Sequence, residues 1–144
     1  DVAGATINYL VIFSRAEDGV LTLQETLTGG SGALFSMLGP NAVAISADGQ
    51  LVAVLGLDDN SLTLFKRQAN AEQANFGQLV LAEILRDGDG AITNLRGPVD
   101  VKFSPDDRHI YVTSSVDNSI QVFRRVFDDL IIERSFEVPP AATQ

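Results

Sequence analysis

The fold is decided by residues 103–125, whose sequence is FSPDDRHIYVTSSVDNSIQVFRR. Residues 45–67, ISADGQLVAVLGLDDNSLTLFKR, follow the same pattern 58 positions earlier. Extended outward, the match relates residues 19–67 to residues 77–125, with 19 identities in 49 aligned positions. Self-similarity at a fixed period of this length is typical of repeat architectures. The chain is therefore predicted to be built from copies of one unit.

Each unit is predicted to hold four short strands, because short apolar runs alternate with turn residues and no helical period extends beyond a turn. The first unit retains only its last two strands, so that ten strands are expected in all. Their predicted ranges are 9–15 and 20–28, then 41–46, 50–56, 61–67 and 78–86, then 100–104, 108–114, 119–125 and 130–136. At an offset of 110, Asn8 and Phe13 fall on Asn118 and Phe123, which places Asp1 within the second strand of a unit.

The inner strands carry apolar residues on both faces, as in residues 51–55, and so need cover on both sides. The fourth strands alternate instead, as expected of an outer strand with one wetter face. Four-stranded antiparallel sheets repeated side by side describe the blades of a β-propeller, whereas a two-sheet sandwich would not explain the repeat. The predicted fold is all-β, with about two and a half blades. Their predicted extents are a half blade over 1–38, full blades over 39–96 and 97–138, and a tail or start of a next blade over 139–144.

Composition limits the partners. The 144 residues include 19 acidic and 10 basic side chains, giving a net charge of −9 and a pI near 4.3, and no cysteine. Such a field repels phosphate backbones and anionic lipid headgroups, so nucleic acid and membrane surfaces are not expected partners. The longest strongly apolar stretch, 51–57, is far shorter than the roughly 20 residues of a membrane-spanning helix. Without cysteine, disulfides, thiolate catalysis and thiolate-bound metals are excluded.

The run Tyr111-Val112-Thr113 and the Asp-Asn-Ser turn that begins at Asp117 resemble the YVTN-type propeller repeat of the lactonase-like superfamily. Ser114 stands where that family usually has asparagine. The resemblance implies a seven-bladed ring, and a family that includes 6-phosphogluconolactonase-like hydrolases as well as bacterial surface and secreted proteins. The remaining blades would come from the same polypeptide or from identical chains, and the half-blade start favours the same polypeptide.

Up-and-down strand order places the turns after the second and fourth strands on one acidic rim. Propellers commonly bind ligands at such a rim or at the channel mouth. The ligand-binding candidates there are Asp58, Asp59, Asp117, Arg86 and Arg96. For the Asp-Asn pairs a plain turn is the favoured alternative, because these residues tolerate left-handed backbone and cap their own turns.

Asp87 and Asp89 lie in a glycine-bent loop and could bind calcium through their carboxylates. The corresponding loop of the first unit, residues 28–32, keeps both glycines and has neither carboxylate, so a turn with positive φ is the favoured alternative. His109, the only histidine, is predicted to pack on a strand face rather than to act as a general base. No other cofactor is expected.

No catalytic constellation accompanies the repeat, so the sequence predicts a non-catalytic propeller segment of a larger, extracytoplasmic bacterial protein. It would be periplasmic, surface-bound or secreted, and would bind a protein or carbohydrate or act as a spacer. Two alternatives remain open. One is part of a lactonase-like hydrolase whose site draws on several blades, and the other is a calcium-stabilised surface module.

Overall fold

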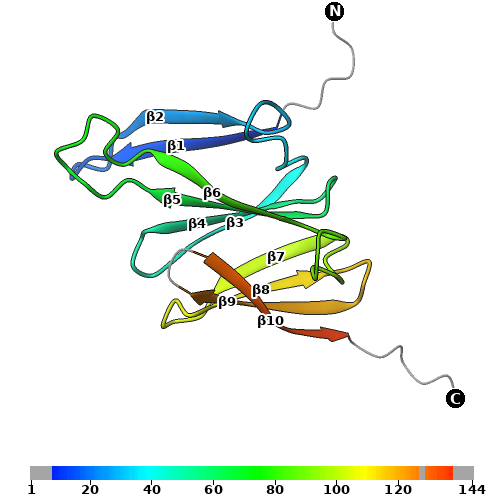
Figure 1. Ribbon diagram of the computed structural model, residues 1–144. Coiled ribbons are helices and arrows are strands. Elements are labelled where there is room, and N and C mark those ends of the chain that lie inside the picture. The colour runs from blue at the N-terminus through cyan, green and yellow to red at the C-terminus, as the bar shows by residue number, and fades with distance from the viewer. Residues whose placement is uncertain (1–7, 127–128, 138–144) are drawn as a thin grey trace, which may run out of the picture.

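The computed structural model describes residues 8–126 and 129–137, and within these ranges every regular element is a β-strand. The strands form one two-stranded and two four-stranded antiparallel sheets, which lie side by side in chain order (Figure 1). They are β1 (Tyr9–Arg15), β2 (Leu21–Thr28), β3 (Pro40–Ile45), β4 (Leu51–Gly56), β5 (Ser61–Arg67), β6 (Leu79–Arg86), β7 (Pro98–Phe103), β8 (His109–Ser114), β9 (Ser119–Val126) and β10 (Asp129–Glu137).

The two larger sheets have the up-and-down order of propeller blades, β3-β4-β5-β6 and β7-β8-β9-β10. Their irregularities also recur, because the register of the first strand pair shifts after Pro40 in one sheet and after Pro98 in the other. The sheet of β1 and β2 matches strands three and four of a blade. A repeated sequence has thus produced a repeated backbone, and the predicted all-β propeller blades are confirmed.

Apolar side chains fill the two spaces between neighbouring sheets. Leu55, Leu62 and Val101 belong to the cluster between the second and third sheets. Val52 and Phe65 belong to the cluster between the first and second. All six residues of β4 are buried because its two faces pack in different clusters, as the apolar run 51–55 predicts.

The first strands β3 and β7 contact each other across the blade boundary. Asn41 Nδ2 in β3 donates a hydrogen bond of 2.8 Å to the carbonyl of Pro98 in β7. First strands that meet in this way mark the side of the blades on which the axis of a propeller ring would pass. The ends of β3 and β7 therefore lie where a ligand at a channel mouth would be contacted.

In the part of the chain that the structure describes, no helix is long and apolar enough to cross a membrane. The predicted strand ranges agree with the structure to within a residue or two at each end. The proposed tail over 139–144 and the placement of Asp1 within a second strand lie outside the described residues, and the blade boundaries stay predictions.

Candidate functional site

The turns after second and fourth strands meet at one end of the sheets, which we call the upper rim. It comprises the turns 57–60 and 115–118 and the connections 29–39 and 87–97. Backbone hydrogen bonds of 3.0 Å from Leu57 N to Gly39 O and 2.8 Å from Ser115 N to Gly97 O fasten each turn to the connection that enters its own blade. The predicted site residues all lie on or beside this rim, namely Asp58, Asp59, Arg86, Asp87, Asp89, Arg96 and Asp117.

Asp59 is a buried carboxylate on the upper rim with three protein donors. Its Oδ2 accepts from Ser36 Oγ at 2.5 Å, and its Oδ1 accepts from Ser61 Oγ at 2.8 Å and from Leu38 N at 3.3 Å. These bonds join the connection 29–39 to the start of β5. The arrangement gives Asp59 a structural role in the turn, since its oxygens are directed at protein groups rather than at solvent.

Asp117 occupies the same place one unit later and binds one residue, Arg96. Its Oδ2 accepts from Arg96 N at 2.7 Å, which is the counterpart of the bond from Leu38 N to Asp59. Its Oδ1 lies 2.7 Å from Arg96 Nε and 2.6 Å from Nη2. Burial acts to raise the pKa of Asp117, whose side chain is 5% exposed, but the guanidinium and the amide of Arg96 outweigh burial and hold the pKa below its usual value.

The asparagines that follow these two carboxylates have left-handed backbone, with φ of 52° at Asn60 and 50° at Asn118. This confirms the predicted turn conformation of the Asp-Asn pairs. Arg86 lies at the end of β6, with its guanidinium carbon 5.9 Å from the centre of the Phe35 ring. The rim cations thus contact the protein itself, Arg96 through an ion pair and Arg86 through an aromatic face.

The loop that carries Asp87 and Asp89 turns through positive φ at Gly88 and Gly90. The two corresponding glycines of the first unit also have positive φ, so the backbone conformation recurs without the carboxylates. Asp87 Oδ1 accepts from Leu95 N at 3.0 Å, whereas Asp89 is exposed. Among the described residues, no group of three or more His, Asp or Glu side chains is arranged to hold a metal ion. Calcium binding stays a prediction that rests on two carboxylates.

His109 lies in β8, partly buried, with its ring 6.3 Å from that of Tyr111. Its backbone N–H donates to Ser104 Oγ at 2.9 Å. The predicted position on a strand face is therefore observed.

Asp58 differs from Asp59 and Asp117 because its carboxylate is exposed and, within the described residues, receives no hydrogen bond or ion pair. It lies over Gly39, where an added Cβ would come within 2.6 Å of the Asp58 carboxyl carbon. Gly39 leads into β3, so this carboxylate stands beside the expected channel mouth. In the next unit Val116 takes the equivalent place, over Gly97. Both units therefore place a side chain over the glycine, charged in one unit and apolar in the other.

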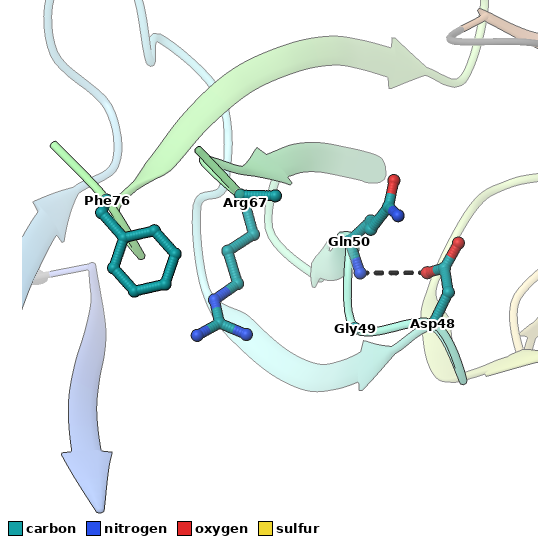
Figure 2. Close-up of a pocket in the computed structure, with 6 residues that line it drawn as sticks. Asp48, Gly49, Gln50, Arg67 and Phe76 are labelled. Carbon is teal, nitrogen blue, oxygen red and sulfur yellow. Dashed lines mark hydrogen bonds between the residues drawn. The ribbon is translucent and has the colours of Figure 1, made fainter. Parts of the chain in front are cut away.

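At the opposite end of the sheets, the lower rim, the structure shows a hollow of about 240 Å³ lined by Asp48, Gly49, Gln50, Arg67, Ala69 and Phe76. Figure 2 shows the Arg67 guanidinium between the Phe76 ring and the turn 48–50. The guanidinium has no ion-pair partner among the described residues. Sequence reasoning missed this hollow, because it forms only where the turn 48–50 is brought together in space with residues 68–76, an insertion in the connection between β5 and β6.

The fold and the repeat define a segment of a β-propeller. No protein-family model and no curated protein sequence matches the chain. Among solved structures, it is similar to a periplasmic gluconolactonase from Pseudomonas aeruginosa, with 27% identity and a TM-score of 0.69 over 91% of this chain and 34% of that one.

Two further structures show the same fold. A Bacteroides fragilis protein provisionally designated a 6-phosphogluconolactonase has 18% identity and a TM-score of 0.68, over 91% of this chain and 33% of its own. A Lactobacillus plantarum protein has 18% identity and a TM-score of 0.67, over 95% of this chain and 38% of its own. The chain thus spans about a third of the length of the solved structures it matches. These likenesses confirm the resemblance to lactonase-like propellers.

The comparisons correct the functional prediction. The sequence predicts a non-catalytic scaffold, because no catalytic motif accompanies the repeat. Two of these three similar structures are named as lactonases, one of them at 27% identity, which contradicts the scaffold and favours the lactonase alternative. The prediction was wrong because a propeller site draws single residues from several blades, so a segment of two and a half blades shows no local motif.

Proposed function

We propose that this chain is part of a lactonase-like hydrolase that opens a sugar lactone. The observation that carries the proposal is the likeness to the periplasmic gluconolactonase, which extends over 91% of the chain at 27% identity. The substrate class follows from that protein's name, and the acidic upper rim beside the channel mouth supplies a suitable group. The other blades of the ring would come from the same polypeptide and would provide the rest of the site.

Within the described residues, Asp58 is the side chain best placed to act. Lactone hydrolysis needs a base that takes a proton from water as the water oxygen attacks the ring carbonyl carbon. The bond from that carbon to the ring oxygen then breaks, and the ring oxygen leaves as a hydroxyl once it is protonated. The exposed Asp58 carboxylate, which has no partner among the described residues, can accept the proton, whereas the buried Asp59 has its oxygens directed at Ser36, Ser61 and Leu38.

The internal repeat also favours Asp58 over its neighbour. Residues that the blade needs for folding recur at the same place in the next unit, as Asp59 recurs at Asp117. Asp58 is replaced there by Val116, although both side chains cover a glycine at the start of a first strand. A carboxylate that the backbone does not require is free to serve a ligand. We therefore assign Asp58 to the substrate site, with Arg86 and Arg96 as outer rim contacts for a carbohydrate.

The test is a lactone hydrolysis assay on the full-length polypeptide that contains this segment, followed as acid release at constant pH. The expected result is turnover of a six-carbon sugar lactone above the uncatalysed rate, and a loss of about 10²- to 10⁴-fold in kcat for Asp58→Asn, the range for removal of a general base. Glu72→Gln, which removes an exposed carboxylate on the insertion at the lower rim, is the matched control and should leave kcat unchanged. Absence of turnover in the wild-type polypeptide would reject the proposed function.

We also propose an extracytoplasmic location, supported by the periplasmic location that the name of the Pseudomonas aeruginosa protein gives. The measurement is activity of an alkaline phosphatase reporter fused after the native full-length polypeptide, because that enzyme folds only where disulfides form. A fusion that is inactive in an ordinary strain, but active in a strain whose cytoplasm is oxidising, would lie in the cytoplasm and would contradict the proposal.

A further inference from the structure

The boundary between the second and third sheets is complete and shows what one unit requires from the unit before it. Arg125 Nη1, at the end of β9, lies 3.1 Å from Asp48 Oδ2 in the turn between β3 and β4. Asp107 also links the two sheets, because its carboxylate accepts hydrogen bonds from the backbone N–H groups of Ala47 and Asp48 at 2.7 and 2.8 Å. Val101 of β7 is covered by the inner strands of the preceding blade and is 1% exposed.

At the boundary between the first and second sheets, the equivalent residues Arg67 and Val43 lack these contacts within the described residues. Arg67 is the counterpart of Arg125, and it has no ion pair within the described chain. Val43 is the counterpart of Val101 and is 56% exposed, and Ile45 beside it is 64% exposed. Val43 and Val101 are the same residue type at equivalent positions of the repeat, so residue type does not explain the difference in their exposed fractions. What differs among the described residues is an inner hairpin, meaning the first two strands of a blade and their turn: β3 and β4 precede the third sheet, and no described inner hairpin precedes the second.

The outer part of this boundary is already formed. Asn8 Oδ1 accepts from Gly39 N at 2.8 Å, and Asn60 Oδ1 accepts from Gly97 N, also at 2.8 Å. The same asparagine thus links each blade to the glycine that opens the next. The two bonds join equivalent residues over the same distance, which indicates that the first sheet meets the second as the second meets the third. A hairpin joined to the edge of β1 that pairs with no described strand would then cover Val43.

We propose that the surface formed by Val43, Ile45 and Arg67 binds an inner hairpin of the same repeat, carried by the polypeptide to which this chain belongs, with an acidic residue in its turn. The apolar strands of the hairpin would cover the two aliphatic side chains, as β3 and β4 cover Val101. Its acidic turn would pair with the Arg67 guanidinium, as Asp48 pairs with Arg125. The hollow on the lower rim is then the seat of this turn rather than a ligand pocket.

The sequence gives the register of such a hairpin. At an offset of 52, Asn8 matches Asn60, and Val2 and Gly4 match Val54 and Gly56. Residues 1–7 thus correspond in sequence to residues 53–59, and the residues that would precede them correspond to 39–52. A copy of residues 39–52 fused before Asp1 of the intact chain completes the hairpin in register, with an acidic turn residue supplied by the copy of Asp48.

The experiment uses the absence of cysteine, because one introduced cysteine can be labelled without background. Val43→Cys is placed in the chain with and without the fused copy, and its rate of reaction with a thiol reagent is measured. The expected result is a rate at least about ten-fold slower in the fused chain. Val20→Cys is the matched control, since Val20 is 57% exposed and lies outside the proposed surface, and its rate should not change.

The charge pairing is tested separately by melting. In the fused chain, Arg67→Gln should lower the Tm by about 2 °C, as expected for a partly exposed ion pair in a domain of this size, and in the unfused chain by less than 1 °C. Replacing the copied Asp48 by Asn should lower the Tm of the fused chain by the same amount. A scrambled version of residues 39–52 should neither protect Val43→Cys nor make the Tm depend on Arg67.

Three outcomes overturn the proposal. The first is an equal reaction rate of Val43→Cys in fused and unfused chains, and the second is protection by the scrambled copy as strong as by the true one. The third is protection of Val43→Cys in the unfused chain by an oligomer seen in sedimentation, which would assign the surface to a second copy. None of these readouts involves lactone hydrolysis, so the interface and the proposed function fail or stand independently.

Discussion

Replacing Asp59 by alanine is predicted to destabilise the chain strongly, without regard to any ligand. The carboxylate holds the hydroxyls of Ser36 and Ser61 and the amide of Leu38 at a buried position. Alanine leaves these donors without their acceptor and opens space beside them. Hydrogen bonds to a charged group contribute about 1.5–3 kcal/mol each, and the Leu38 bond is long, so we expect a loss of about 3–5 kcal/mol in the free energy of unfolding.

The measurement is urea unfolding, supported by a thermal scan in which a loss of this size lowers the Tm by about 10 °C. Asp58→Asn is the control, because it changes the adjacent carboxylate, which is exposed and makes no bond within the described residues. Its free energy of unfolding should stay within about 0.5 kcal/mol of wild type. If Asp59→Ala unfolded at the wild-type urea concentration, the structural role of Asp59 would be refuted and a ligand-binding role would regain support.

Four further predictions address the blades. Gly39→Ala should cost about 1–3 kcal/mol of unfolding free energy, since φ is 62° there and a Cβ would meet the carboxylate of the facing turn. Val101→Ala should cost about 1.5–2.5 kcal/mol, whereas Val43→Ala, at the equivalent but exposed position, should cost less than about 0.5 kcal/mol. The Ser46 hydroxyl, with the Gln50 backbone N–H, holds the pKa of Asp48 below its usual value of 3.8. The ionised carboxylate therefore stabilises the fold above that pH, and this stabilisation is lost as the pH falls through the folded-state pKa. The Tm difference between wild type and Ser46→Ala should accordingly be larger at pH 6 than at pH 2.5. A calcium chelator should lower the Tm if Asp87 and Asp89 bind calcium, and an unchanged Tm would remove that prediction.

The sequence predicts the strands and their stacking well because both depend on local patterns that occur twice. The run 51–55 predicts a strand buried on both faces, and β4 is buried throughout. The Asp-Asn pairs predict left-handed turns, and Asn60 and Asn118 have positive φ. Each of these features follows from a few adjacent residues, so the second copy serves as an independent confirmation.

The contacts between units could not be predicted in the same way. The bond from Asn8 to Gly39 spans 31 residues, and the pair of Arg125 with Asp48 spans 77. Asp48 and Asp106 occupy equivalent turns, yet Asp48 pairs with Arg125 of the next blade, whereas a carboxylate oxygen of Asp106 lies 3.8 Å from Arg108 Nε in its own turn. The stacking of whole sheets determines which charged residues form ion pairs. The hollow beside Arg67 could not be predicted for the same reason.

Comparison of the two copies of a repeat distinguishes residues that stabilise the fold from residues that bind a ligand, because both copies must adopt the same backbone conformation. Asp59 and Asp117 each accept a hydrogen bond from the amide of the preceding connection, so their recurrence has a structural cause. Asp58 has no such cause, since Val116 covers the corresponding glycine equally well. Beside the expected ring axis, the Asp58 carboxylate forms no hydrogen bond or ion pair within the described residues that would account for its presence. Substitution of Asp58 should therefore change activity at constant stability, and substitution of Asp59 should change stability first, so the two neighbouring carboxylates distinguish catalysis from folding in one pair of variants.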